Sequence, residues 1–295
     1  MTRVRGLRAL RRRNAPGFEF WRRFRKNRGA VAGLLFLLLI AILALLADIV
    51  APNDPMTPGV GDRLEAPGSA FPMGTDNLGR DILSGVVHGA RVSLVIGITA
   101  ASISALIGTL MGAASGYFGG AVDEILMRVC ELFQSMPRFL FALVIVVFFG
   151  NSIWNVVLVL GILSWTRTGR LVRAEFLRLR GSDFVVAAKA SGASEWRIIV
   201  RHVFPNVVHI IVVTTSLEVG DVILAEAGLS FLGAGDPNLM SWGRMLYTAQ
   251  RYLRTAWWFS VFPGMAIFLT ILALNLFGDG LNDALNPRLR RVAAE

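Results

Sequence analysis

The sequence predicts an all-α integral membrane protein with six transmembrane helices and both ends of the chain in the cytoplasm. Of its 295 residues, 54% are hydrophobic and 17% are charged, against about 25% charged residues in ordinary soluble domains. Three uncharged runs, at residues 30–47, 92–122 and 256–278, approach or exceed the length of about 20 residues that crosses a bilayer as a helix. These observations exclude a soluble single-domain enzyme.

Residues 1–29 form a basic segment that precedes the first uncharged run. The segment contains eleven basic residues and one acid, Glu19, and such a flank keeps the adjacent end of a span in the cytoplasm. The net charge of +10 is therefore explained by topology, with weak attraction to anionic headgroups as a by-product, and no nucleic-acid partner is expected. The uncharged core that follows exceeds the roughly 7–15 residues of a signal peptide, which favours a retained anchor.

The first transmembrane helix is expected at residues 30–51, because the acids and prolines of residues 48–55 cannot continue it. The chain then forms an extracytoplasmic loop at residues 52–91. From residue 54 onward this loop has five acids against three arginines, a composition that fits the outer side better than the inner side. Within the loop, we expect a short helix from Asp81 to Gly89.

Residues 92–285 are predicted to form the transmembrane core of the protein. Its first span, residues 92–116, carries small side chains at four-residue intervals, which form one stripe and allow another helix to pack closely. The stripe consists of Ala100, Ser104, Gly108, Gly112 and Gly116. We interpret it as a packing surface within the chain, because small residues position helices and perform no chemistry.

The third and fourth spans are predicted to form a hairpin that begins near Glu131, turns at residues 150–152 and ends near Leu171. The uncharged run at residues 139–166 is too long for one span and too short for two. From residue 167 to residue 202 there are eight basic residues against three acids, so this stretch should face the cytoplasm. An even number of crossings must therefore precede it, and a hairpin satisfies this requirement.

The fifth span is expected at residues 203–229 and the sixth at residues 256–277. Pro205 falls in the first turn of the fifth span, where its missing amide is tolerated. Residues 231–254 between these spans form a second outer loop, and residues 286–295 form a basic cytoplasmic tail. Six spans with both ends inside account for the charge distribution, although the second outer loop is more basic than this rule prefers.

Motifs for nucleotide hydrolysis and metal binding are missing from the sequence. Neither lysine, Lys26 nor Lys189, stands in the Gly-x-x-x-x-Gly-Lys-Ser/Thr pattern of a phosphate-binding loop. The three histidines are far apart in the predicted span map, and a single cysteine, Cys130, cannot form an internal disulfide. We therefore expect a non-enzymatic chain without catalytic residues, metal site or bound cofactor.

The cytoplasmic loop at residues 172–202 is predicted to contain two short helices at an angle. Ser182 or Asp183 can cap the first helix, Gly192 can take a left-handed conformation after it, and Ser194 can start the second. Four residues with helical spacing, mostly small, share one face of the first helix: Phe184, Ala187, Ala188 and Ser191. This face favours docking of another protein, since a helix lying on lipid headgroups would carry larger apolar side chains.

Three acids, Glu218, Asp221 and Glu226, fall inside the fifth span. Ionisable groups within a span usually face the protein interior or a water-filled cavity, and Glu218 and Asp221 share a face. They are candidates for a polar pathway lining that meets an amino group or cation of a solute. A helix-packing contact or proximity to the outer headgroups explains them equally well.

Several motifs together resemble a known family of transport proteins. Ala187–Ala188, Gly192 and the His202-x-Phe204–Pro205 spacing resemble the "EAA" loop of permease subunits of binding-protein-dependent ABC importers. The segments at residues 71–81, 89–94, 228–233, 241–243, 275–281 and 283–288 resemble the C-type permeases of dipeptide, oligopeptide and nickel importers. The resemblance extends over about residues 20–290, and the motifs stand in register at separate places.

This resemblance implies a type I ABC importer permease fold with a cytoplasmic coupling helix, in a bacterial inner membrane. It further implies import of di- or oligopeptides or of a related solute such as a nickel chelate. The implied partners are a second homologous permease, two ABC ATPase subunits that hold ATP and magnesium, and an extracytoplasmic solute-binding protein. The ATPase-coupling residues would be Phe184, Ala187, Ala188, Ser191, Gly192, His202, Phe204 and Pro205.

The loop departs from the family pattern at three positions. Val186 stands where the pattern has glutamate, and His202 and Phe204 replace isoleucine and leucine, which affects one polar contact more than docking itself.

For Asp76, Arg80 and Asp81 a capped turn in the outer loop is the simpler interpretation, and contact with the binding protein is the alternative. An ion-gradient-driven secondary carrier that uses Glu218 and Asp221 is the alternative function.

Overall fold

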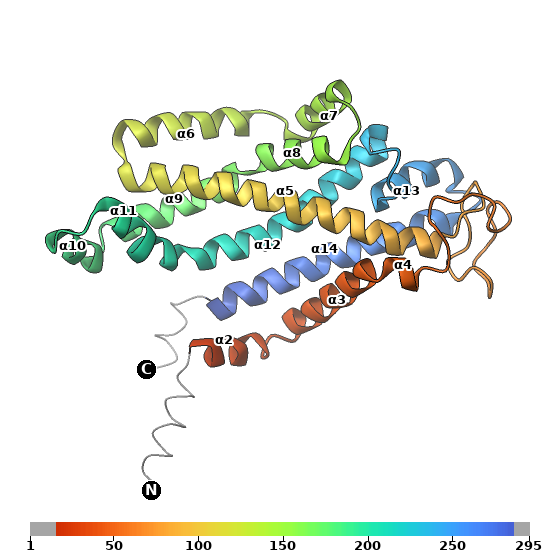
Figure 1. Cartoon of the computed structure of the whole chain (residues 1–295), viewed down its shortest axis with the longest axis horizontal. Coiled ribbons are helices and arrows are strands. Elements are labelled where there is room, and N and C mark those ends of the chain that lie inside the picture. The colour runs from red at the N-terminus through yellow and green to blue at the C-terminus, as the bar shows by residue number, and fades with distance from the viewer. Residues whose placement is uncertain (1–15, 286–295) are drawn as a thin grey trace, which may run out of the picture.

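The computed structural model describes residues 16–285, which fold into helices joined by short turns and one long outer segment (Figure 1). Residues 1–15 and the tail at residues 286–295 lie outside the described part, and so do the predictions made for them. The helices are α2 (Pro16–Phe24), α3 (Arg28–Leu45), α4 (Ala47–Val50), α5 (Ile82–Phe118), α6 (Gly120–Ser135), α7 (Arg138–Phe149), α8 (Ile153–Ser164), α9 (Thr166–Arg180), α10 (Asp183–Ala190), α11 (Glu195–Arg197), α12 (Phe204–Leu229), α13 (Trp242–Ala249) and α14 (Trp257–Leu285). Short π- or 3₁₀-helical turns, η1 (Ile198–Val203), η2 (Ser230–Ala234) and η3 (Gln250–Tyr252), continue α11, α12 and α13.

Four helical stretches are long and apolar enough to cross a membrane: α3, α5, Glu195–Ala234 and α14. The bent pair α6 and α7, which meet at 82°, makes a fifth if it is counted as one span. Helices α8 and α9 follow one another and run along α5 (Figure 1), but α9 is rich in arginine. The described chain is therefore an all-helical membrane protein with four or five apolar candidate spans.

Helices α3 and α4 together match the predicted first span. Asn27 caps α3 by accepting a hydrogen bond from the backbone amide of Ala30 at 3.1 Å, and the helix breaks at Leu46 before α4. Helix α2, which the sequence analysis did not anticipate, precedes this span. Its Phe24 is buried and packs edge-on against the ring of Phe277 in α14, so α2 extends the contact between the two ends of the described chain.

Helix α5 corrects the prediction of a short helix at residues 81–89 followed by a separate span from residue 92. The structure has one helix of 37 residues, capped by Asp81, so residues 82–91 of the predicted outer loop are helical. The charge of Arg91 lies within this helix, and its guanidinium donates to the carbonyl of Ala44 at 2.9 Å and pairs with Asp48 at 3.0 Å. Because these distant partners satisfy the charge, the helix continues through it.

The hairpin turn predicted at residues 150–152 is confirmed, with Gly150 in the positive-φ region that favours glycine. The expected start near Glu131 is wrong, because α6 already begins at Gly120. The pass is also broken after Ser135: Met136 is extended and precedes Pro137, and a residue before proline avoids the helical conformation. The ascending arm of the hairpin is therefore two helices that meet at a sharp bend.

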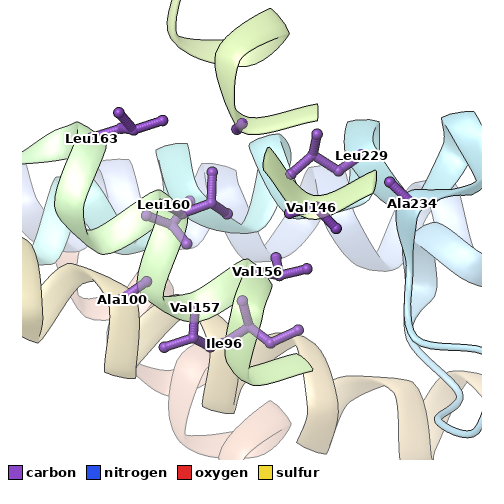
Figure 2. Packing of buried hydrophobic residues seen from close by; sticks show 11 residues of the cluster. Ile96, Ala100, Val146, Val156, Val157, Leu160, Leu163, Leu229 and Ala234 are labelled. Atoms are coloured by element: carbon purple, nitrogen blue, oxygen red, sulfur yellow. The ribbon is translucent and has the colours of Figure 1, made fainter. Parts of the chain in front are cut away.

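The stripe of small residues on α5 packs against α9, as predicted. A Cβ atom added at Gly112 would approach the carbonyl oxygen of Gly169 to 2.3 Å, and one at Gly116 would approach that of Arg173 to 2.6 Å. A second apolar cluster joins α5, α7, α8 and α12, and Figure 2 shows Leu160 and Val157 of α8 between Ala100 of α5 and the neighbouring helices. The core thus forms around α5.

Helix α12 runs from Phe204 to Leu229, in agreement with the predicted fifth span. The second outer loop, expected to be turns, also contains α13, which Ser241 starts by accepting a hydrogen bond from the amide of Arg244. Trp242 is fully buried there, and its indole nitrogen donates to the carbonyl of Val86 at 2.9 Å. Helix α14 begins at Trp257, as expected, but continues to Leu285.

Candidate functional site

The loop between α9 and α12 has the two-helix form that its sequence predicts. Ser182 is extended before α10, Gly192 has φ of +76°, and Ser194 is extended before α11. From Glu195 the chain is helical through to Leu232, and Gly233 then leaves the helical conformation with a φ of +89°. Figure 1 shows α10 and α11 at one end of the molecule, next to the junction of α5 and α6 and far from α13.

Helix α10 is anchored to the helices behind it by one side of its surface. Val185 is fully buried in a cluster with Val172 and Phe176 of α9 and with Ile198 of η1. Ala188 is half-buried against the same cluster. The predicted small face is therefore divided, with Ala188 turned toward the protein.

The other members of that face remain on the surface. Phe184 is 42% exposed, and Ala187 and Ser191 are exposed beside it. Val186, where the family pattern has glutamate, is also exposed. Three of the four predicted contact residues are thus accessible to another molecule.

Polar contacts fix the loop to the end of α5. The hydroxyl of Tyr117 donates a hydrogen bond to the carboxylate of Glu195. The Lys189 ammonium lies 3.5 Å from the same carboxylate and 5.4 Å from the centre of the Tyr117 ring. The loop and the end of α5 are therefore positioned to move as one body.

The start of α12 carries the remaining residues of the predicted loop motif. Pro205 lies in the first turn of α12 and is exposed, and the side-chain amide of Asn206 donates to the carbonyl of His202 at 2.7 Å. Phe204 is partly exposed, whereas Val203 and Val207 are buried. The π-helical turn η1 carries the chain into α12 without a break.

The outer turn uses its two acids to hold backbone amides. The Asp76 carboxylate accepts hydrogen bonds from the amides of Leu78 and Arg80 at 2.7 and 2.9 Å, and Asp81 accepts those of the first residues of α5. Both acids are buried. This geometry is a capped turn.

Arg80 lies beside a small pocket of about 150 Å³ that is also lined by Arg244 of α13. Arg244 donates to the carbonyl oxygens of Asp236 and Leu239. Burial lowers the pKa of Arg244, and the positive charge of Arg80 lowers it further. The outer turn and the loop before α13 therefore meet at this pocket.

The three acids of α12 have different surroundings. Glu218 is buried, with its carboxylate 3.9 Å from the guanidinium of Arg138, whereas Asp221 is exposed and pairs with Arg167 at 3.3 Å. Glu226 is buried nearer the outer end. It accepts hydrogen bonds from the hydroxyls of Ser230 and Ser241 at 2.7 and 2.8 Å, which ties α12 to the start of α13.

Arg138 and Arg167 were not among the residues singled out in the sequence. They flank the uncharged run at residues 139–166, and only Arg167 belongs to the excess of basic residues that predicts a cytoplasmic loop at residues 167–202. The signal that could have identified them is the presence of two unbalanced cations and two unbalanced acids in neighbouring predicted spans. Within residues 16–285, no three His, Cys, Asp or Glu side chains come together in a possible metal site.

The fold defines a class: an all-helical integral membrane protein, with an exposed two-helix loop at one end. The chain belongs to the family described as binding-protein-dependent transport system inner membrane component, whose sequence model matches residues 104–291. Residues 16–67 match the N-terminal transmembrane domain of oligopeptide transport permease C. The family resemblance seen in the sequence is confirmed.

Curated relatives agree with this assignment along nearly the whole chain. The glutathione transport system permease protein GsiD of Pectobacterium atrosepticum is 42% identical over 277 residues, which cover 93% of this chain and 92% of the relative. The di/tripeptide transport system permease protein DppC of Pseudomonas aeruginosa is 40% identical over 288 residues, covering 95% and 94%. GsiD of Escherichia coli O6:K15:H31 is 41% identical over 277 residues, covering 93% and 91%.

The chain is thus a multi-pass inner-membrane permease of an ABC importer, and it is a transport component and not itself the ATPase. A binding-protein-dependent system of this kind implies ATPase and binding-protein partners.

Proposed function

We propose that this chain forms one half of the translocation pathway of an ATP-driven importer of small peptides. Supporting this solute class, relatives that are 40–42% identical over more than nine-tenths of the chain are permeases for glutathione and for di- and tripeptides. Glutathione is itself a tripeptide, so the class of small peptides includes the solutes named for both relatives. A nickel chelate is a less favoured solute of the same kind of system.

Six crossings with both ends in the cytoplasm fit this role. The four long apolar helices supply four passes, the bent pair α6 and α7 supplies a fifth, and α8 with α9 supplies the sixth. Figure 1 supports this count, since α6 and the α8–α9 pair lie alongside α5 and run in opposite directions. The α10–α11 end is then cytoplasmic, which agrees with the excess of arginine in α9.

The missing half of the pathway would come from a second homologous permease. Helix α7 is a candidate for this contact, since it leaves large apolar side chains on the surface, including Leu140, Val147, Phe148 and Phe149. Two ABC ATPase subunits would hold ATP and magnesium, and an extracytoplasmic binding protein would deliver the solute. The outer turn, with Arg80 between the buried Asp76 and Asp81, would lie under that binding protein.

The exposed part of α10 would be the contact with an ATPase subunit, through Phe184, Ala187 and Ser191. Ala188 would support the contact from behind. ATP-driven closure of the ATPases would move α10, with Gly192 as the turn that holds its angle. Such a lever switches the permease between two discrete packings.

The helical continuity from Glu195 to Leu232 gives this motion a path into the membrane. His202, Phe204 and Pro205 lie where the loop enters α12, and the same helix carries Glu218, Asp221 and Glu226. A tilt that begins at α10 would therefore displace the acids of α12. Glu218 and Asp221 would line the pathway, and Glu226 would link the tilt to the outer loop.

The decisive test is co-purification of an ATPase subunit with this chain from detergent-solubilised membranes. Ala187→Trp places a bulky side chain on the exposed face of α10 and should abolish the association. Ala188 is less suitable, since it is half-buried and a change there would disturb packing. Ala70→Trp, at an exposed alanine of the outer segment, is the matched control and should retain the ATPase.

Transport by the reconstituted complex completes the test. ATP-dependent uptake of dialanine or glutathione with the binding protein present is expected. Uptake driven by an ion gradient without any ATPase would instead support the secondary carrier, in which Glu218 and Asp221 would be the ion sites.

A further inference from the structure

Four charged side chains lie away from both ends of the proposed passes α6–α7, α8–α9 and α12. We call Arg138, Arg167, Glu218 and Asp221 the mid-span cluster. Glu218 follows the start of α12 by about 14 residues, or about 21 Å at the helical rise. Arg167 lies about as far from either end of the α8–α9 pass, and Arg138 stands at the bend between α6 and α7.

The cluster faces outward from this chain. The side chains of Arg138, Arg167 and Asp221 are 45%, 54% and 57% exposed. Charged groups at such depth are costly against lipid tails and are found facing a water-filled cavity or another protein. This surface of the permease is therefore turned away from the hydrocarbon.

The two ion pairs leave hydrogen-bonding capacity unused. The Arg138 guanidinium lies 3.9 Å from the nearer oxygen of Glu218 and 3.4 Å from the hydroxyl of Ser164. That oxygen, Oε1 of Glu218, is buried and has no hydrogen-bond donor among the described residues. A buried charge without full hydrogen bonding is unfavourable, so the site is suited to receive a further donor.

The break between α6 and α7, beside the cluster, also supports a solute site. Helices α6 and α7 meet at 82° immediately before Arg138. Non-helical backbone at membrane depth is tolerated where it is buried in protein or lines a water-filled cavity, and discontinuous helices build the solute sites of many transporters. The bend between α6 and α7 thus lies at the same depth in the bundle as the charged side chains of the mid-span cluster.

We propose that the mid-span cluster binds the permeating solute transiently, and that the solute class is a dipolar molecule with both a carboxylate and an ammonium group. This inference rests on the proposed function and adds Arg138 and Arg167 to it as specificity-determining residues. The arginines receive the carboxylate, and Glu218 and Asp221 receive the ammonium.

The pairing of the charges explains why a dipolar solute is favoured. In the empty state each arginine neutralises one acid, so the mid-span cluster holds no net charge. A solute with both charges inserts between the partners and leaves that balance unchanged. A solute with one charge would leave one side chain of the cluster uncompensated, which is costly in a low dielectric.

The test uses the complete importer, with both permeases, the ATPases and the binding protein, reconstituted in proteoliposomes with labelled dialanine or glutathione. Arg167→Gln should lower uptake about tenfold, since a hydrogen bond between charged groups is lost. ATP hydrolysis stimulated by the loaded binding protein should persist, because docking and coupling are intact. Arg138→Gln should act in the same way.

The matched control is Arg178→Gln. Arg178 lies on the same helix α9, has the same 54% exposure and is also ion-paired, to Glu175 at 2.6 Å, but it lies near the end of the pass. Uptake by the importer that carries Arg178→Gln should stay within about twofold of wild type, as expected for an exposed ion pair. The double variant Arg167→Asp with Asp221→Arg keeps the pair and should recover part of the uptake.

Three results would overturn the proposal. Uptake by Arg138→Gln and Arg167→Gln equal to that of Arg178→Gln would exclude a role in solute passage. Loss of the second permease from the purified complex, with normal uptake per assembled complex, would make the cluster a subunit interface. Absence of dialanine and glutathione uptake by wild type, with ATP hydrolysis retained, would overturn the proposed function and this inference with it.

Discussion

Helix α12 connects two regions of opposite character. At the α10–α11 end, an apolar anchor at Val185 and the contacts among Tyr117, Lys189 and Glu195 hold the loop against α5. In the middle of the same helix, Glu218 has a distant ion pair and an oxygen without a donor. The comparison suggests that the permease is rigid where force would enter and incompletely bonded where the solute would pass.

The contact between α5 and α9 supports both regions, so breaking it should lower the stability of the protein more than the other changes proposed below. In Gly112→Val, the new side chain would collide with the backbone of Gly169, because even a Cβ atom comes within 2.3 Å of its carbonyl oxygen. We expect a loss of about 3 kcal/mol, at the upper end for an overpacked core. Thermal unfolding of the purified protein in detergent measures it.

Gly264→Val provides the control for this prediction. A Cβ atom at Gly264 meets no atom within 4 Å, and the residue lies inside α14 as Gly112 lies inside α5. Its unfolding midpoint should therefore remain near that of wild type. Equal midpoints for the two variants would show that the small-residue stripe does not support the fold.

The loop could be predicted because its signals are local. Ser182, Gly192 and Ser194 act through their own backbone conformations, and each lies within a residue or two of the element that it bounds. The family motifs fall mainly in such segments.

The mid-span cluster could not be predicted because its partners are distant in sequence. Arg138 meets a residue 80 positions away, and Arg167 meets one 54 positions away, and neither pairing follows a helical spacing. Similarly, the partners of Arg91 in α3 and α4, Ala44 and Asp48, lie 47 and 43 positions away. The bend at Met136 had a local signal, Pro137, but a single proline does not define how the two halves are oriented.

A change at Val185, which anchors α10, should lower the stability of the protein to an intermediate degree. Val185→Ala removes two buried methyl groups and should cost about 2 kcal/mol, with a loss of uptake per ATP hydrolysed because α10 no longer moves with α5 and α12. Val186→Ala, at the exposed neighbouring position, should change neither quantity. Coupled uptake that is equal in the two variants would mean that burial of Val185 does not transmit the motion.

The smallest loss of stability should come from a change in the Lys189–Glu195 ion pair of the loop. This pair can be compared directly with the ion pairs of the mid-span cluster. Lys189 and Glu195 are 41% and 58% exposed at 3.5 Å, so water screens their attraction and Lys189→Gln should cost less than about 1 kcal/mol. Tyr117 still donates to Glu195 in that variant, which keeps the loop attached. Arg167→Gln changes a side chain of comparable exposure, but it removes a member of the mid-span cluster that would contact the permeating solute. Uptake measurements on the two variants should therefore separate sharply, and a similar loss in both would mean that depth in the membrane does not distinguish the two regions.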